Sequence, residues 1–166
     1  ITAMVNQSLT LEETIAKALE AVLDAIQFEM GGIGLWDETE RQLHPVMAKG
    51  VEAELQALFS GTPRAGGLRE RVLRSGRPLF IDDTAHHKGV NPDIARYGFT
   101  ASAIVPLISK GETLGLLAVA TRAQRHWASE DRSLLTAVCQ YIAMTIATAR
   151  LYEKARQLAT FNETIV

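Results

Sequence analysis

Apolar residues recur at helical spacing near both ends of the chain. Between residues 8 and 28 they follow steps of three and four, which indicates a helix with one buried face. These positions are Ile15, Ala18, Leu19, Val22, Leu23 and Ile26. Thr10 and Glu13 have the spacing of a capping box and predict the first turn of this helix. A second apolar stripe begins after Ser129 and predicts a long helix that continues past residue 150.

Short runs of apolar and β-branched residues lie between these helices and predict strands. The predicted strands cover residues 31–37, 42–50, 78–81, 101–108 and 113–121, and short helices are expected at 52–59 and 68–76. Residues 82–99 are polar and irregular, with one helical turn expected near 92–97. This order of elements predicts an α+β fold with a mostly antiparallel sheet of five or six strands.

The strands predicted at 101–108 and 113–121 are apolar on both faces. In the first of them, one side carries Ala103, Val105 and Leu107, and the other carries Ile104, Pro106 and Ile108. Because a sheet with one wet face alternates apolar with polar residues, both faces must be covered. We expect the terminal helices on one face and residues 51–99 over the other. Such an irregular cover can enclose a pocket, and the alternative is a plain structural cover with no ligand.

The composition indicates which kinds of partner and which cellular compartment are expected for this protein. The 166 residues suit one domain, and a net charge of -2 without a basic stripe disfavours nucleic acid as a partner. Cys139 is the only cysteine, so an intrachain disulfide and a cysteine zinc cluster are excluded, and we expect a small buried hydrophobe there. Apolar runs such as LGLLAVA are too short to cross a bilayer, so we expect a cytoplasmic protein with no direct membrane insertion. Because the chain begins at Ile1, we expect a fragment of a longer protein or a processed chain.

The C-terminal half combines four sequence motifs. They are a Val-Pro-Leu strand, a hairpin with two spaced glycines, an aromatic residue before an acidic helix start, and a helix that ends in Leu-Tyr-Glu. The residues are Val105, Pro106, Leu107, Gly111, Gly115, Leu117, Trp127, Glu130, Asp131, Leu134, Leu135, Ala149, Leu151, Tyr152 and Glu153. Together with the segments LEETIAKALEAVLDAI and SGRPLFIDDT, they make nearly the whole chain similar to the GAF domain family.

The resemblance implies a GAF/PAS-like fold with a central antiparallel sheet of five to six strands. In such a fold the N- and C-terminal helices pack on one face, and short helices and loops lie over the other. The resemblance implies a GAF domain over residues 1–150, with helices at 8–28 and 129–150, and an outgoing signalling helix or coiled-coil linker at 151–166. GAF domains commonly precede histidine kinases, diguanylate cyclases and transcription activators, and they bind small molecules or no known ligand.

The sequence does not favour several of the specific ligands that members of the family bind. Covalent bilin attachment needs a cysteine near the lid, and none is present there. The Asn-Lys, Phe and Asp-Glu signature of the cyclic-nucleotide class is missing, and reduction of methionine sulfoxide would need more than one thiol. Haem ligation by His86 or His87 is conceivable, but two solvated loop histidines are the simpler interpretation. The cofactor is therefore unknown, and we expect no metal site.

The resemblance places a pocket between the sheet and the segment that matches residues 78–105. The candidate pocket residues are Trp36, Phe80, Asp83, His86, His87, Asn91, Arg96, Tyr97 and Phe99. For the polar members the alternative is turn chemistry, and for the aromatic members it is the core. His44 and His126 have no acidic or metal partner at a recognisable spacing.

The end of the chain carries a heptad-like seam. Leu151, Ala155, Leu158, Asn162 and Ile165 follow alternating steps of four and three, as the core positions of a coiled coil do. This pattern predicts a homodimer formed through the terminal helices. The alternative is a helix that frays or packs back on its own domain.

Taken together, the sequence predicts a cytoplasmic, non-catalytic sensor domain that binds an unidentified small molecule. We expect it to regulate a C-terminal output domain in the parent chain, with a sensor histidine kinase of a two-component system as the first choice. The alternative function is a ligandless dimerisation or scaffold module of a signalling or transcription-regulatory protein.

Overall fold

The computed structural model describes residues 2–165, with side chains from residue 10 to residue 163. The elements in chain order are α1 (Thr2–Ile26), β1 (Met30–Asp37), β2 (Gln42–Lys49), the 3-10 helix η1 (Ala53–Leu58), α2 (Leu68–Ser75), β3 (Leu79–Ile81), α3 (Pro92–Arg96), β4 (Ala101–Ser109), β5 (Glu112–Thr121) and α4 (Ser129–Ile165). Each predicted strand and helix is present, with bounds that differ by a few residues.

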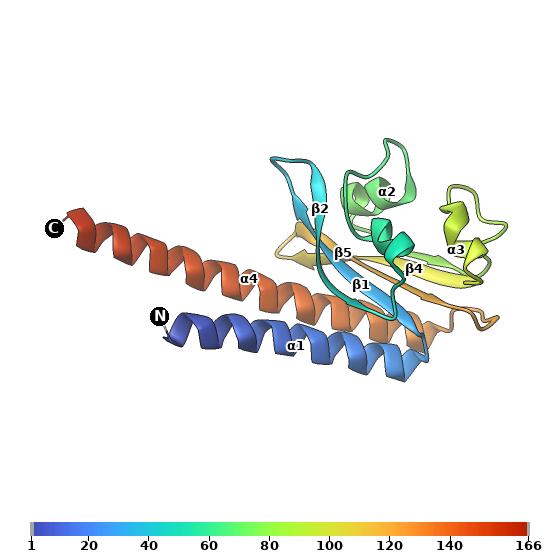
Figure 1. The fold of residues 1–166 in the computed structure, drawn as a ribbon, viewed down its shortest axis with the longest axis horizontal. Helices are drawn as coiled ribbons and strands as arrows, with labels where there is room; N and C mark the ends of the chain where they lie inside the picture. The colour runs from blue at the N-terminus through green and yellow to red at the C-terminus, as the bar shows by residue number, and fades with distance from the viewer. Residues whose placement is uncertain (1, 166) are drawn as a thin grey trace.

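The strands form one five-stranded sheet in the order β2-β1-β5-β4-β3, and every neighbouring pair is antiparallel. Figure 1 shows α1 and α4 side by side along one face of this sheet, with α2 and α3 over the other. The predicted α+β fold and its two covered faces are therefore confirmed, and the number of strands is five.

The face of the sheet beneath α1 and α4, here called the helix face, holds the main hydrophobic core. It combines the apolar stripe of α1, the alternate residues of β4 and β5, and one side of α4. The α4 members are Leu135, Cys139, Ile142, Ala143 and Ile146, each nearly inaccessible to solvent. The regular spacing of apolar residues in both helices is what lets them fill this face without gaps.

The predicted start of the first helix was wrong. The helix begins at Thr2, upstream of the expected capping box, so Thr10 lies inside the helix rather than at its N-cap. The carbonyl of Thr10 accepts a hydrogen bond from the Thr14 hydroxyl at 2.7 Å, which is an intrahelical contact. Residues 2–9 contain no proline or glycine, so nothing in their sequence ends the helix before the capping signal.

The glycines of β1 allow its neighbours to approach closely on both faces. A methyl group added at Gly31 would lie 3.0 Å from the side chain of Leu23 in α1. A methyl group added at Gly32 would clash with the ring of Phe59, and one at Gly34 would clash with the backbone carbonyl of Phe59. The chain after η1 therefore lies directly on β1, and glycine is required for this contact.

Helix α4 continues past the sheet (Figure 1), and most of the described side chains after residue 150 are exposed. Leu151 is 60% exposed and Leu158 is 57% exposed, whereas Ile165 is helical but its side chain lies outside the described residues. By length and composition alone, the stretch Ser129–Glu163 could also span a membrane. Its first half forms the core of this domain, and core helices of soluble proteins commonly meet the same criterion.

Candidate functional site

A cavity of about 290 Å³ lies between the sheet and the irregular segment that covers it. Its floor is formed by side chains of β1, β3, β4 and β5 that point away from α1 and α4, and its roof by residues of η1, α2 and the chain leading into α3. We call this space the sheet cavity. It lies on the face where the sequence predicted an enclosing cover.

The floor of the sheet cavity carries three small side chains on the central strands, Ser102, Ala118 and Ala120, beside the larger Ile104. Ser102 and Ile104 of β4 and Ala118 and Ala120 of β5 alternate with residues that pack on the helix face. In the register, Ser102 pairs with Ala120 and Ile104 pairs with Ala118, so the small residues lie next to each other. These small side chains leave the space that larger ones would fill.

The roof is held in place by contacts at both of its ends. At one end Phe59, only 1% exposed, packs over the glycines of β1. At the other end the buried hydroxyl of Thr84 donates a hydrogen bond to the carbonyl of Phe99 at 2.6 Å, and the Thr84 amide donates to the Thr100 carbonyl. Because both ends are fixed, the segment between them can span the sheet without collapsing onto it.

Two arginines and one asparagine supply polar groups at the cavity wall. The Nη1 atom of Arg69 donates a hydrogen bond to the Ser60 carbonyl at 2.8 Å, and partial burial lowers the pKa of the Arg69 guanidinium from its ordinary value. An arginine that is only partly buried remains fully protonated at neutral pH. Arg64 is exposed and precedes the turn that contains Gly66 and Gly67. The Oδ1 atom of Asn91 accepts from the Asp93 amide at 2.9 Å and caps α3.

Of the nine candidate residues, only Asn91 lines the sheet cavity. Phe80 lies on the helix face, where its ring centroid is 5.0 Å from that of Trp127. Neighbouring residues of a strand point to opposite faces, so Ile81 lines the cavity and Phe80 cannot. Trp36 and Phe99 pack in the apolar clusters on either side of the cavity.

The polar candidates lie in the exposed part of the cover. His86 Nδ1 is 2.7 Å from Asp83 Oδ2, and this hydrogen bond is the main reason why the pKa of Asp83 is lowered. Arg96 forms an ion pair of 2.8 Å within α3. His87 and Tyr97 are half-buried outside the cavity. Asp83 and Arg96 interact with neighbouring side chains of the cover, whereas Val90 and Ile94 of the same stretch turn inward. Ligand binding by these polar residues stays a prediction.

Sequence reasoning missed most of the residues that form the cavity. Arg64 comes from the loop before α2, and Leu68 and Arg69 from the first turn of α2; all three lie within the expected cover of residues 51–99 but were not named as candidates. The floor residues Ser102 and Ala118 could have been found, because the strand alternation already separated the two faces. The small size of these floor residues was the available signal.

Trp127 connects the cavity floor to the start of α4. Its indole Nε1 donates to the carbonyl of Ser102 at 3.0 Å and to the carbonyl of Ile81 at 3.2 Å, and both of these residues line the cavity. The backbone amide of Trp127 donates to Asp82 at 2.9 Å, which is the main cause of the lowered pKa of Asp82. His126 also lies 3.3 Å from Asp82, so it has the acidic neighbour that its sequence spacing did not reveal.

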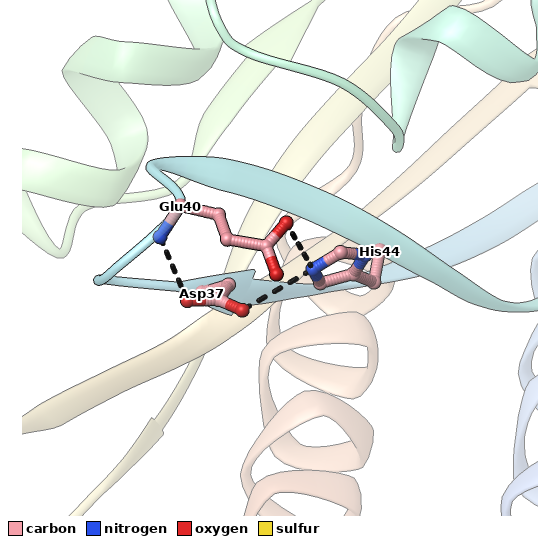
Figure 2. A group of neighbouring side chains, drawn as sticks. All are labelled: Asp37, Glu40 and His44. Carbon is pink, nitrogen blue, oxygen red and sulfur yellow. Dashed lines mark hydrogen bonds and ion pairs between the residues drawn. The ribbon is translucent and has the colours of Figure 1, made fainter.

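Asp37, Glu40 and His44 meet at the hairpin between β1 and β2 (Figure 2). The Nε2 atom of His44 lies 3.3 Å from Asp37 and 3.8 Å from Glu40. The spacing of these residues does not predict this contact, because only the register of the hairpin brings the three side chains together. The other oxygen of Asp37 accepts hydrogen bonds from the backbone amides of Glu40 and Thr39, and the bond from Glu40 is the main cause of the lowered pKa of Asp37. These hydrogen bonds of an exposed turn account for the cluster.

Cys139 lies in the core between α4 and the sheet and is 1% exposed. Desolvation raises the pKa of its thiol to about 12 from an ordinary value of 9.0. The prediction of a small buried hydrophobe is therefore confirmed. A thiol of this kind has almost no nucleophilic thiolate at neutral pH.

Comparison with known proteins agrees with the shape of the fold. A family model described as GAF domain matches residues 8–147. No curated protein shows significant similarity to the chain.

Solved structures with the same fold come from proteins of different kinds. A domain from a protein assigned as a two-component sensor histidine kinase of Sinorhizobium meliloti 1021 superposes with a TM-score of 0.72 at 19% identity, covering 88% of this chain and 96% of that one. Residues 122 to 287 of a methyl-accepting chemotaxis protein give 0.69 at 21% identity, covering 90% and 96%. The free methionine-R-sulfoxide reductase of Neisseria meningitidis, in complex with its substrate, gives 0.71 at 16% identity, covering 86% and 81%.

Proposed function

Because this chain belongs to the GAF domain family, we propose that it is a sensor domain that binds a small molecule and regulates an attached output domain. The observation that carries the proposal is the cavity of about 290 Å³ between the sheet and its cover, which is partly open to solvent. This volume is at the lower end of the range for small-molecule sites, and an apolar lining with few polar groups is typical of them.

The strands beneath the cavity offer a route from the ligand to the outgoing helix. In β4, Ser102 and Ile104 face the cavity while Ala103 and Val105 pack against α4 and α1. The indole of Trp127 bonds to the backbone of Ser102 immediately before α4 begins. A ligand that shifts β4 therefore acts on the start of α4. It changes the output only if it binds two arrangements of this helix with different affinity.

The exposed face of α4 supports a homodimer as the form that transmits the signal. The heptad register of the seam continues backward from Leu151 through exposed Met144, Tyr141 and Leu134, with Thr148 and Ala137 at the core positions between them. A second copy with the same repeat would bury this stripe along most of the helix. The output domain proposed to follow is a histidine kinase, in line with the similar domain of Sinorhizobium meliloti, and the compartment is the cytoplasm.

The domain itself is proposed to be non-catalytic, although one neighbour of the same fold is an enzyme. Redox chemistry on a sulfoxide with thiols needs a nucleophilic and a resolving cysteine. This chain has Cys139 alone, and burial raises the pKa of that thiol to about 12. A ligandless dimerisation module remains the second candidate, because the exposed seam on α4 would serve it equally well.

Native mass spectrometry of the protein purified from its own host tests the sensor proposal. A non-covalent adduct should be present and should be lost in Ala118→Leu, which places a larger side chain on the cavity floor. The control Ala48→Leu makes the same change at an exposed position of β2 and should keep the adduct. If no preparation carries an adduct, the dimerisation module becomes the better description.

Light scattering during gel filtration tests the dimer. Replacing Leu151 and Leu158 together by Gln should convert a dimer to a monomer, because both side chains lie on the exposed seam. The control Val46→Gln removes an exposed apolar side chain from β2 and should leave the dimer intact. A monomer in the unaltered protein would contradict the proposed arrangement.

A further inference from the structure

We propose that the ligand of the sheet cavity is a small organic anion, held at its carboxylate or phosphate group by Arg64 and Arg69. This inference rests on the proposed function, since it names the class of molecule that the cavity takes. Both arginines line the cavity, and its remaining walls are apolar except for Asn91 and Ser102. The ligand is therefore a molecule with one charged end and an apolar body.

The charge of the cavity wall is opposite to that of the chain as a whole. The wall holds two arginines and, within the described part of the chain, no acidic residue, although the whole chain has a net charge of -2. The guanidinium of Arg69 is partly buried, so its charge is less well solvated than that of exposed Arg64 and gains most from a nearby counter-charge. A bound anion supplies that counter-charge.

Two acidic residues that are sequence neighbours of cavity-lining residues are engaged with other cations. Glu70 pairs with Arg74 at 3.4 Å, and Asp93 pairs with Arg96 at 2.8 Å. Among the residues that the structure describes, no ion pair involves Arg64 or Arg69. The two arginines of the cavity are thus not neutralised by the protein itself.

Arg69 is positioned for anion recognition by its contact with the chain after η1. Its Nη1 atom donates to the Ser60 carbonyl at 2.8 Å, which fixes the guanidinium plane next to the cavity. This bond uses one of the five N–H donors of the guanidinium. A planar group with parallel donors suits a carboxylate or a phosphate, which can accept two bonds at once.

The apolar part of the cavity selects the rest of the ligand. Leu58 and Ile94 in the roof and Met30 and Ile104 in the floor offer hydrocarbon surface but few hydrogen-bonding groups. A highly hydroxylated anion would leave polar groups unpaired there, at a cost in affinity. A compact aromatic or aliphatic acid satisfies both the charged and the apolar parts of the wall.

Amide-detected NMR titration with four probes of nearly equal shape tests the inference. Benzoate and phenyl phosphate carry the anion, benzamide is neutral, and benzylammonium is cationic. We expect both anions to shift the amide signals of Gly67, Arg69 and Val90, and to bind at least tenfold more tightly than benzamide or benzylammonium. The ratio between benzoate and phenyl phosphate tells a carboxylate site from a phosphate site.

Matched variants assign the effect to the two arginines. Arg69→Gln and Arg64→Gln should each lower the affinity for benzoate about three- to tenfold and should leave that for benzamide unchanged. Arg71→Gln removes an exposed arginine from the same helix, outside the cavity, and should change neither affinity. Unchanged amide spectra away from the substitution confirm that each variant is folded.

Two results would overturn the inference, and they differ in what they say of the proposed function. Benzamide or benzylammonium binding as tightly as the anions would refute an anion site and leave the cavity as a ligand site. No shift with any of the four probes at 20 mM, together with native mass spectra free of adducts, would refute both.

Discussion

The two faces of the sheet are built from the same strands but are covered in different ways. The helix face is covered by two long helices, and its side chains join in one continuous core. The opposite face is covered by η1, α2, α3 and their loops, and its side chains form two smaller clusters with the sheet cavity between them. Long amphipathic helices fill the space above a sheet, whereas short irregular segments leave part of it open.

This difference assigns separate tasks to the two faces. The helix face supplies most of the apolar burial that stabilises the domain. The cavity face keeps small residues such as Ala118 and Ala120 where larger ones would increase burial. Space that could have been packed is instead available to a ligand, so the cavity face is the less stable but more adaptable side.

The reactivity of cysteines on the two faces should give the largest contrast. A thiol pKa of about 12 in place of 9.0 leaves Cys139 with roughly a thousandth of the usual thiolate. Ser102→Cys in a Cys139→Ala background places a thiol on the cavity floor. It should react with methyl methanethiosulfonate at least a hundredfold faster than native Cys139, measured by mass spectrometry. Equal rates would mean that the cavity is closed to small molecules.

The second-largest difference between the two faces should be in the loss of stability when an isoleucine is replaced by alanine. Ile142→Ala opens a hole in the close-packed helix face and should lower the free energy of unfolding by about 3 kcal/mol. Ile104→Ala enlarges a cavity that already exists and should cost only about 1 kcal/mol. Urea denaturation of both variants provides the comparison. Similar losses at the two positions would show that the cavity face is packed as tightly as the other.

A methyl group at Gly34 tests where the cavity face is close-packed. It would clash with the carbonyl of Phe59, so Gly34→Ala should destabilise the fold by about 2 kcal/mol. Gly111→Ala is the control, because its surroundings are open and only the strain of its positive φ of 78° opposes the change. That strain should cost about 1 kcal/mol. Thermal unfolding monitored by circular dichroism measures both, and a harmless Gly34→Ala would place the chain after η1 farther from β1.

The smallest effect is expected at the junction between the two faces, where Asp82 accepts from the Trp127 amide. This bond lowers the pKa of Asp82 in the folded protein below the value of about 4 that an aspartate has in the unfolded chain. The bond therefore stabilises the fold fully above about pH 4. Its contribution is lost as the pH falls through the folded-state pKa, where Asp82 becomes protonated. The Asp82 side chain is 43% exposed, so Asp82→Ala should cost less than about 1 kcal/mol at pH 7. The difference from the unaltered protein should shrink below pH 4 in urea titrations. A difference that stays constant down to pH 2 would contradict this account.

The sequence predicted the framework well because periodicity is a local property. The apolar stripes of α1 and α4 and the double-sided strands β4 and β5 were visible directly, and they require two covered faces. The helix start at Thr2 was missed because a capping signal does not stop a helix when the preceding residues also favour one. Local signals therefore gave the elements more reliably than their ends.

The residues of the pocket were predicted less well, because they are set by the direction in which each side chain points and not by the type of residue. Polar and aromatic residues of the cover were chosen for their chemistry, yet Phe80 faces α4 and His86 bonds to Asp83 in solvent. Arg64 and Arg69 were overlooked because a lone arginine beside a glycine turn carries no signal of its own. Their common position at the cavity wall exists only once the cover has folded over the sheet.

What the sequence determined by itself was the set of helices and strands and the need to cover both faces of the sheet. The spacing of apolar residues along the chain is enough for that, since it sets which side of each element avoids water. Only the tertiary structure decided that the cover does not pack fully against the sheet, which leaves a cavity with two arginines in its wall. This outcome depends on how segments distant in sequence meet, as they do where Phe59 packs on Gly32 and Gly34.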